Sequence, residues 1–305
     1  RLEKDERFCP RRLNEFTASA KAKLSPQQFQ RHNQEDLARF IVAREGNVSA
    51  ALRQLTGSVE WTEAVLGDQR ECQLCRRDPS CHSHVPIGLE ESENSSILYG
   101  CPARATHTAV DPIVHHVSHQ LEYCYALPHT GSRWVWCVDY NGFGLKEALQ
   151  GKLGARFGAL FNNHMPERLH KILLLNPPSV FRLLLQAAKP FVDQRTLDKI
   201  IPVTGSTKMV LQTLRDDHHF PAPALNWLQL VLDQKLPNQL PALPSESRSM
   251  MMPSLMPVFE FVEPLEFENT KDRPRNEKST LRLVRTSSLL KGSVTAHNQI
   301  QIVQS

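Results

Sequence analysis

The sequence predicts an α/β domain preceded by a small helical unit. Short apolar runs, each long enough for one buried strand, recur in the middle of the chain, and the stretches between them have helical spacing. The N-terminal region, in contrast, shows helical spacing throughout. With 305 residues, 40% of them hydrophobic, the chain is long and apolar enough to bury a sizeable core. We therefore expect an alternating α/β arrangement with a largely parallel sheet.

The helical unit is predicted to cover residues 1–67. Apolar residues recur at helical intervals in two stretches, 29–41 and 48–55. Gly46 and Asn47 stand between these stretches, where they break the helical pattern.

A connector is predicted at residues 68–96. It holds Cys72, Cys75 and Cys81, and it ends in a polar run at 90–96 that we do not expect to pack. We therefore expect a region rich in loops.

The α/β domain is predicted at residues 97–237. The buried strands are expected at 97–99, 134–138, 172–175 and 200–203, and the helices at 107–127, 145–162 and 179–191. Connections of this length favour parallel pairing of the strands.

The last part of the chain, residues 238–305, is rich in proline, serine and charged residues. Such a composition buries too little apolar surface to offset the entropy of ordering, so we predict a mostly disordered tail.

Net charge, hydropathy and cysteine content indicate in which cellular compartment the protein acts. The net charge of +4 suits an anionic membrane surface as well as weak nucleic-acid contact. No apolar run reaches the roughly 18 residues of a membrane span, and the charged start of the chain has no signal core behind it. Seven cysteines in a long chain fit a reducing compartment better than a disulfide framework. We expect a cytoplasmic protein that is peripheral to membranes.

Two parts of the sequence carry a recognisable pattern. The first consists of residues 37–44, 47–51 and 60–61, and the second of residues 139–142, 166–169, 171–178, 181, 189–193 and 196–200. Together they resemble the Sec14-like (CRAL-TRIO) family: the first part is similar to its N-terminal helices, and the second is similar in order and spacing to its core pattern. The resemblance covers about residues 35 to 205.

This resemblance implies a lipid-binding fold. An N-terminal helical bracket would precede a mixed sheet that forms the floor of an apolar pocket roofed by helices. One helix, at about 178–189, would act as a gate, with Phe181, Leu184 and Leu185 on its apolar run. The alternative is an ordinary core helix.

The resemblance also implies a phosphatidylinositol headgroup site, carried over onto Arg44, Glu167, Asp193, Thr196 and Lys199. A phosphodiester removed from water needs fixed cationic donors, which arginine and lysine supply, and inositol hydroxyls need acceptors such as a carboxylate. The alternative is a plain ion-pair network at the rim of the sheet.

The sequence departs from the family pattern at Glu45, where a second basic residue often follows the arginine. It also departs at Trp134 and Trp136, which occupy positions where members that bind phosphatidylcholine have small hydroxyl residues. Alternation along a strand places both indoles on one face. We expect them to exclude phosphatidylcholine, in that they either close its headgroup site or wall a pocket for a different hydrophobic ligand, such as a sterol-like or isoprenoid molecule. The alternative is that they point away from the cavity into the helix layer.

The connector could hold a structural zinc ion. Cys72, Cys75 and Cys81, with His82 or His84, offer thiolate and imidazole ligands within a short stretch. The alternative is a set of free thiols. His115, His116 and His119 lack the His-Glu-x-x-His arrangement, so we assign them no metal.

The function that follows is phosphatidylinositol binding, with transfer between membranes or presentation to lipid kinases, and no enzymatic activity. No cofactor is required in this interpretation, apart from the candidate zinc. We expect a monomer that docks transiently on membranes and does not bind nucleic acid. The alternatives are a scaffold that kept the fold for protein contacts and a lipid hydrolase; the second is disfavoured because the sequence has no Gly-x-Ser-x-Gly elbow.

Overall fold

A computed structural model describes residues 5–66, 72, 74–75, 81–127, 129–144, 151–181, 186, 194–234, 240–248 and 250. Residues Arg1–Glu263 belong to one compact unit. Three residues of the predicted sites, Leu184, Leu185 and Asp193, lie outside the described residues.

The N-terminal unit consists of four α-helices and a final π-helical turn, which are α1 (Pro10–Lys23), α2 (Pro26–Gln30), α3 (Gln34–Ala43), α4 (Val48–Trp61) and η2 (Thr62–Leu66). Ser25 and Asn33 close capping boxes at the starts of α2 and α3. Gly46, with a φ of +79°, provides the left-handed turn between α3 and α4.

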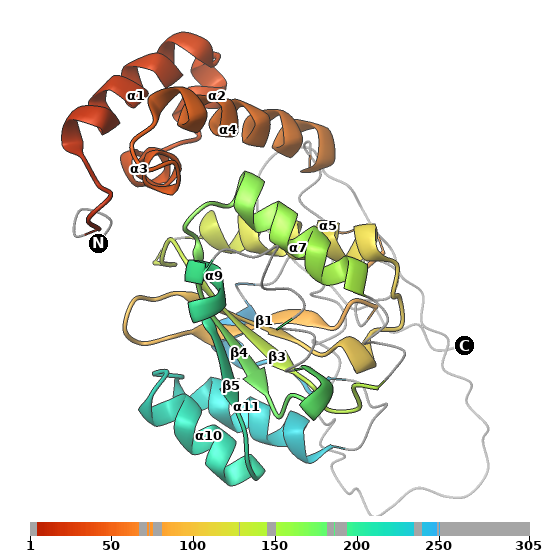
Figure 1. The fold of residues 1–305 in the computed structure, drawn as a ribbon. Coiled ribbons are helices and arrows are strands. Elements are labelled where there is room, and N and C mark those ends of the chain that lie inside the picture. The colour runs from red at the N-terminus through yellow and green to blue at the C-terminus, as the bar shows by residue number, and fades with distance from the viewer. Residues whose placement is uncertain are drawn as a thin grey trace, which may run out of the picture. The chain divides into compact units, whose positions relative to one another are not determined.

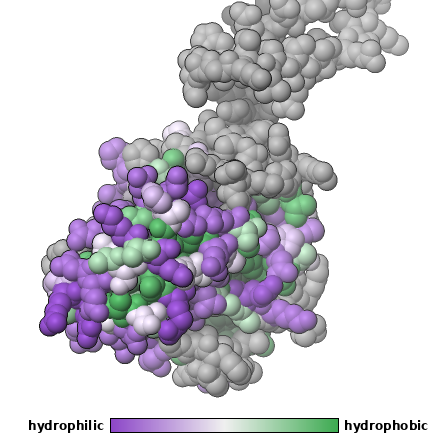
Figure 2. All heavy atoms as spheres, turned by 90° about the horizontal axis from the view of Figure 1, so that it is seen from above, coloured by the Kyte–Doolittle hydropathy of each residue, from purple (hydrophilic) through white to green (hydrophobic). Residues whose placement is uncertain are grey.

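The surface seen in Figure 2 is mainly hydrophilic, with small hydrophobic patches between the polar side chains.

A five-stranded mixed sheet forms the centre of the second part of the chain (Figure 1). Its strands are β1 (His84–Leu89), β2 (Ser96–Gly100), β3 (Trp134–Asp139), β4 (Leu169–Leu175) and β5 (Ile200–Val203), in that spatial order. β1 is antiparallel to β2, and the other neighbours are parallel. The sheet confirms the mixed α/β fold and the four predicted strands β2 to β5.

Helices cover both faces of this sheet (Figure 1). α5 (Val110–Tyr125) and α7 (Gly151–His164) lie on one face, and α10 (Thr207–Asp216) and α11 (Ala222–Asp233) lie on the other. The short helices are η3 (Pro102–Arg104), α9 (Gln194–Asp198) and α12 (Ser245–Arg248). Within the described residues, no helix is long and apolar enough to cross a membrane.

Strand β1 lies in the stretch that was predicted as a loop-rich connector, so that prediction was wrong for residues 84–89. The strand pattern is hidden by Pro86 and Gly88, where the pairing with β2 shifts register. The polar run after β1 also packs, because the Glu90 carboxylate accepts hydrogen bonds from the backbone N–H groups of Ser92 and Glu93. Polar residues can be buried when their hydrogen bonds are satisfied in this way.

The start of the predicted tail is ordered as well, contrary to expectation. Leu243 and Met250 are buried, at 2% and 4% exposure. The backbone carbonyl groups of this segment also accept hydrogen bonds, from Trp227 Nε1 to Pro241 and from Gln120 Nε2 to Met250. The composition of this segment predicts disorder. Its buried apolar side chains and its hydrogen-bonded carbonyl groups nevertheless stabilise one conformation.

Candidate functional site

The predicted headgroup residues lie on three neighbouring parts of the fold. Arg44 follows the last turn of α3 and lines a cavity of about 480 Å³ beside α4, together with Arg53 and His164. Glu167 stands in the turn between α7 and β4, in a left-handed conformation with φ at +56°. Thr196 lies on α9, and Lys199 directly follows that helix.

Glu167 forms an ion pair with Arg7, a residue that the sequence did not point to. Arg7 Nη1 lies 2.8 Å from Glu167 Oε1, and the same nitrogen donates to the carbonyl oxygen of Val42 at 3.4 Å. Asp5 holds the other side of the guanidinium, with its carboxylate 2.5 Å from Arg7 Nη2. The hydrogen bonds that Arg7 donates to Asp5 and Glu167 outweigh burial and raise the pKa of Arg7, and they hold the guanidinium beside Glu167.

α9 is joined to the loop after α3. Arg195 Nη2 lies 3.8 Å from Glu45 Oε1. The backbone N–H of Lys199 donates to Thr196, and the Lys199 carbonyl accepts from Ile172 on β4. α9 therefore contacts the loop that carries Arg44, and Glu45, the acidic departure from the family pattern, has a cationic partner of its own. Arg44 itself lines the cavity beside α4, and Glu167, Thr196 and Lys199 are not among the residues that line it.

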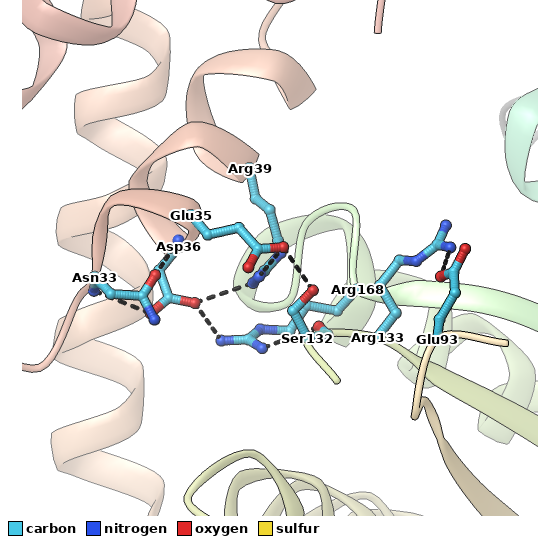
Figure 3. Close-up of polar contacts among 8 residues, drawn as sticks. All are labelled: Asn33, Glu35, Asp36, Arg39, Glu93, Ser132, Arg133 and Arg168. Atoms are coloured by element: carbon cyan, nitrogen blue, oxygen red, sulfur yellow. Dashed lines mark hydrogen bonds and ion pairs between the residues drawn. The ribbon is translucent and has the colours of Figure 1, made fainter. Parts of the chain in front are cut away.

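A second set of charges joins α3 to the α/β domain (Figure 3). The Asp36 carboxylate accepts from Arg168 at 2.9 Å and from Arg39 at 3.0 Å. Arg168 also donates to the backbone carbonyl of Ser132, and its guanidinium lies 3.8 Å from the centre of the Tyr125 ring. Since these contacts occupy Arg168, its role is to position α3 on the domain.

The two indoles lie on the sheet face that α5 and α7 cover. Trp134 and Trp136 are buried, and the Trp134 ring lies 5.0 Å from Phe161 on α7. The Trp136 ring lies 4.7 Å from Phe157, also on α7. Both side chains therefore pack into the helix layer, which is the arrangement that the sequence analysis gave as the alternative to walling a ligand pocket.

Phe181 is the gate-helix residue that the structure describes. Its backbone N–H donates to Pro178, and its ring contacts Tyr140 edge-on at 5.2 Å between centroids. Leu184 and Leu185 lie outside the described residues, so the gate itself stays a prediction.

The cysteines of the connector meet two histidines in a buried cluster. The ligand atoms of Cys72, Cys75, His82 and His116 all lie within 4.8 Å of one another. The Cys75 sulfur is 3.2 Å from Nδ1 of His82 and 3.2 Å from Nδ1 of His116. This set could hold a metal ion, and its fourth member comes from α5, to which the sequence analysis assigned no metal.

The other predicted ligands are placed differently. Cys81 is not one of these four, although its sulfur lies 3.5 Å from that of Cys75. His84 turns its Nδ1 to the backbone carbonyl of His82 at 2.7 Å, and its ring lies 6.0 Å from that of Trp136. His84 was therefore a wrong choice of ligand, because its position on β1 directs the ring toward the sheet.

The thiols of the cluster influence one another's protonation. A hydrogen bond with Cys75 lowers the pKa of Cys81 to about 5, and hydrogen bonding with Cys72 and Cys81 raises the pKa of Cys75. Burial lowers the pKa of His82, but hydrogen bonds to the Cys72 and Cys81 sulfurs outweigh burial and raise it to about 9. Negative charge is thus favoured on the Cys72 and Cys81 sulfurs, whose pKa values are lowered, and disfavoured on the Cys75 sulfur between them.

Glu90, Glu93 and His170 form a second group with metal-ligand atoms. Its carboxylates already have partners, since Glu90 accepts from its own turn and Glu93 pairs with Arg133 (Figure 3). This group stabilises the turn between β1 and β2.

Comparison with known proteins identifies the domain. The model of the family described as CRAL/TRIO domain matches residues 82–222. Among solved structures, the crystal structure of Sfh5 is similar at 16% identity and a TM-score of 0.47, over 63% of this chain and 75% of that chain. No curated protein matches the chain. The matched region spans all five strands, so the sheet and its covering helices are similar to a CRAL/TRIO domain, a family of lipid-binding and lipid-transfer proteins.

Proposed function

We propose that this protein binds phosphatidylinositol and either transfers it between membranes or presents it to lipid kinases. Proteins with CRAL/TRIO domains are lipid carriers rather than enzymes. The observation that supports the phosphatidylinositol proposal is that Glu167 binds a cation, Arg7, which also contacts the end of α3, while the loop after α3 pairs with α9 through Glu45 and Arg195.

The charges at this place suit a phosphoinositol headgroup. Arg7 forms an ion pair with Glu167. In this proposal Arg7 supplies the second cation, because the position after Arg44, where the family often has a basic residue, is occupied by Glu45. A phosphate that entered between Arg7 and Lys199 would receive charge-assisted hydrogen bonds from a planar guanidinium and a point-like ammonium. Thr196 and Asp193 would bind the hydroxyl groups. The protein would act in the cytoplasm as a monomer, docking transiently on membranes.

The second ligand in this proposal is a hydrophobic molecule other than phosphatidylcholine. Trp134 and Trp136 fill the space beneath α7 with two large rings packed on Phe157 and Phe161. The support for excluding phosphatidylcholine is the replacement of small hydroxyl residues by two indoles, and the packing of both rings in the helix layer gives no pocket wall in addition. Stoichiometric phosphatidylcholine in the purified protein would contradict this part of the proposal.

Mass spectrometry of lipids that co-purify with the protein from a eukaryotic host tests the headgroup site. We expect phosphatidylinositol in the wild type and its loss in Lys199→Ala, with about a tenfold decrease in Arg7→Gln. Lys208→Ala is the matched control, because Lys208 is an exposed lysine on α10 and should leave the lipid content unchanged.

Each result of this experiment has a definite meaning. Equal phosphatidylinositol in wild type and Lys199→Ala, with circular dichroism showing both folded, would place the headgroup elsewhere. A protein without any lipid would favour the scaffold function, for which the specific observation is that Glu167 and Glu45 already have cationic partners within the chain.

A further inference from the structure

We propose that Cys72, Cys75, His82 and His116 bind a structural zinc ion that fastens the connector to α5. This site is independent of the headgroup site, because none of its ligands lies in the Arg44 loop, the Glu167 turn or α9.

The distances within the set suit tetrahedral coordination. Zn–S bonds of about 2.3 Å and Zn–N bonds of about 2.0–2.1 Å place neighbouring ligand atoms about 3.3–3.8 Å apart in a tetrahedron. The sulfur of Cys75 lies 3.2 Å from each imidazole Nδ1, and the sulfur of Cys72 lies 3.7 Å from His82 Nδ1. Two thiolates and two imidazoles are a common ligand set for structural zinc, and the Cys-x-x-Cys spacing supplies the two sulfurs from one turn.

His116 is oriented as a metal ligand. Its Nε2 lies 2.9 Å from the backbone carbonyl of His84 and donates its proton there. In a neutral imidazole this leaves the lone pair on Nδ1, the atom that faces Cys75. A hydrogen bond from the far nitrogen to a carbonyl group is the usual means by which a zinc-binding histidine is held in the correct tautomer and orientation.

The burial of the four ligand side chains favours a bound metal ion over a cluster of thiols and imidazoles without metal. Cys72 is 6% exposed, Cys75 and His82 are fully buried, and His116 is 1% exposed. Thiolates and imidazoles removed from water need compensating partners, and a divalent cation satisfies all four ligand atoms at once. Four protein ligands would complete the tetrahedral coordination of the ion and leave no open position for a substrate, so the role is structural.

The site would hold together three parts of the chain. Cys72 and Cys75 lie in the connector, His82 precedes β1, and His116 is in the middle of α5. The ion would thereby fix the edge strand β1 against α5, which covers one face of the lipid-binding domain. Because a preformed site is absent from an unfolded chain, zinc binding would contribute directly to the stability of this corner.

The first test is elemental analysis of the purified full chain by inductively coupled plasma mass spectrometry. We expect one equivalent of zinc in the wild type and its loss in Cys75→Ser and His116→Asn. His115→Asn is the matched control, because His115 is the exposed neighbour of His116 on the same helix, and it should keep the zinc. Cys81→Ser should also keep it, since Cys81 lies outside the four.

The possible results distinguish a direct loss of zinc ligands from a general loss of folding. Less than a tenth of an equivalent of zinc in the wild type would overturn the site, and loss of zinc in Cys81→Ser together with retention in His116→Asn would overturn this set of ligands. Since the ligand variants could fail to fold, cobalt replacement in the wild type gives a second reading. Tetrahedral cobalt bands with thiolate charge transfer are expected, and an octahedral spectrum without charge transfer would contradict the proposal.

Discussion

Glu90 is a carboxylate buried in a turn between two strands, where its exposure is 2%. Its Oε1 accepts from the backbone of Glu93, and its Oε2 accepts from the backbone and hydroxyl groups of Ser92. Burial raises the pKa of this carboxyl group, but the hydrogen bonds from Ser92 and Ser95 outweigh burial, so the pKa lies below its ordinary value. One side chain therefore organises the backbone donors of the whole turn.

Replacing Glu90 should destabilise the fold because its donors lose their acceptor. We expect Glu90→Ala to lower the free energy of unfolding by about 2–3 kcal/mol, measured by urea denaturation at pH 7. Glu91→Ala, at an exposed neighbouring position, should change it by less than about 0.5 kcal/mol. Equal effects of the two substitutions would show that the buried carboxylate does not hold the turn.

The pH dependence of this contribution has a definite sign. A carboxyl group with a lowered pKa in the folded state stabilises the fold above its unfolded pKa of about 4.3, and the stabilisation is lost as the pH falls through the folded value. The difference in stability between wild type and Glu90→Ala should therefore shrink below about pH 4.

Two residues show what sequence reasoning could not reach. Arg7 meets Glu167 across 160 positions of the chain, and His116 meets Cys75 across 41. Local spacing predicted Cys72 and Cys75 because a Cys-x-x-Cys turn is contained in four residues. Only the packing of α5 over the sheet brings His116 to them, so no short motif could have found it.

At the level of elements, α3 is attached to the α/β domain through Asp36. Its carboxylate binds Arg39, which is 3% exposed, and Arg168, which is 18% exposed, in the network of Figure 3. Without Asp36, Arg39 would keep the ion pair with the more exposed Glu35, and Arg168 would keep its hydrogen bond to Ser132 but lose its bond to the Asp36 carboxylate. Losing a partner is costly for a largely buried charge.

We expect Asp36→Ala to lower the free energy of unfolding by about 3 kcal/mol, because Arg39 and Arg168 would lose their shared acceptor. The matched control is Asp111→Ala, which breaks the ion pair with Arg156 between α5 and α7. Both of those side chains are about 60% exposed, so the loss should stay below about 1 kcal/mol. If thermal or urea unfolding gave similar losses for the two variants, the Asp36 network would not be an anchor of α3.

The elements that the sequence predicted are those with an uninterrupted apolar pattern. β2, β3 and the second half of β4 are apolar runs because central strands in the parallel part of a sheet are covered on both faces, and β5 was predicted from its run Ile200-Ile201 although it contains Pro202 and lies at the edge. β1 was missed because it contains Pro86 and Gly88 and is followed by polar residues, which are features of a turn. As an edge strand with a register shift it tolerates both residues.

At the scale of the whole molecule, the segment after α11 connects parts on both faces of the sheet. Leu243 packs in the core shared by β1 and α11, whereas the Met250 carbonyl accepts from Gln120 on α5, which covers the opposite face. α12, between these anchors, contacts β1. Composition predicted a disordered tail here. The proline and serine content correctly indicated irregular structure in this segment, but the segment is ordered.

This segment should contribute measurably to global stability. Leu243→Ala would leave a cavity in the core next to α11, and we expect a loss of about 2–4 kcal/mol in the free energy of unfolding, measured by urea denaturation. Leu230→Ala is the control, because Leu230 lies on α11 with 57% of its side chain exposed, and its loss should be below about 1 kcal/mol. Since an undocked segment would also uncover the edge strand β1, Leu243→Ala should aggregate faster on heating. Unchanged stability and unchanged light scattering in that variant would mean that the fold is complete at α11 and that the segment only rests on it.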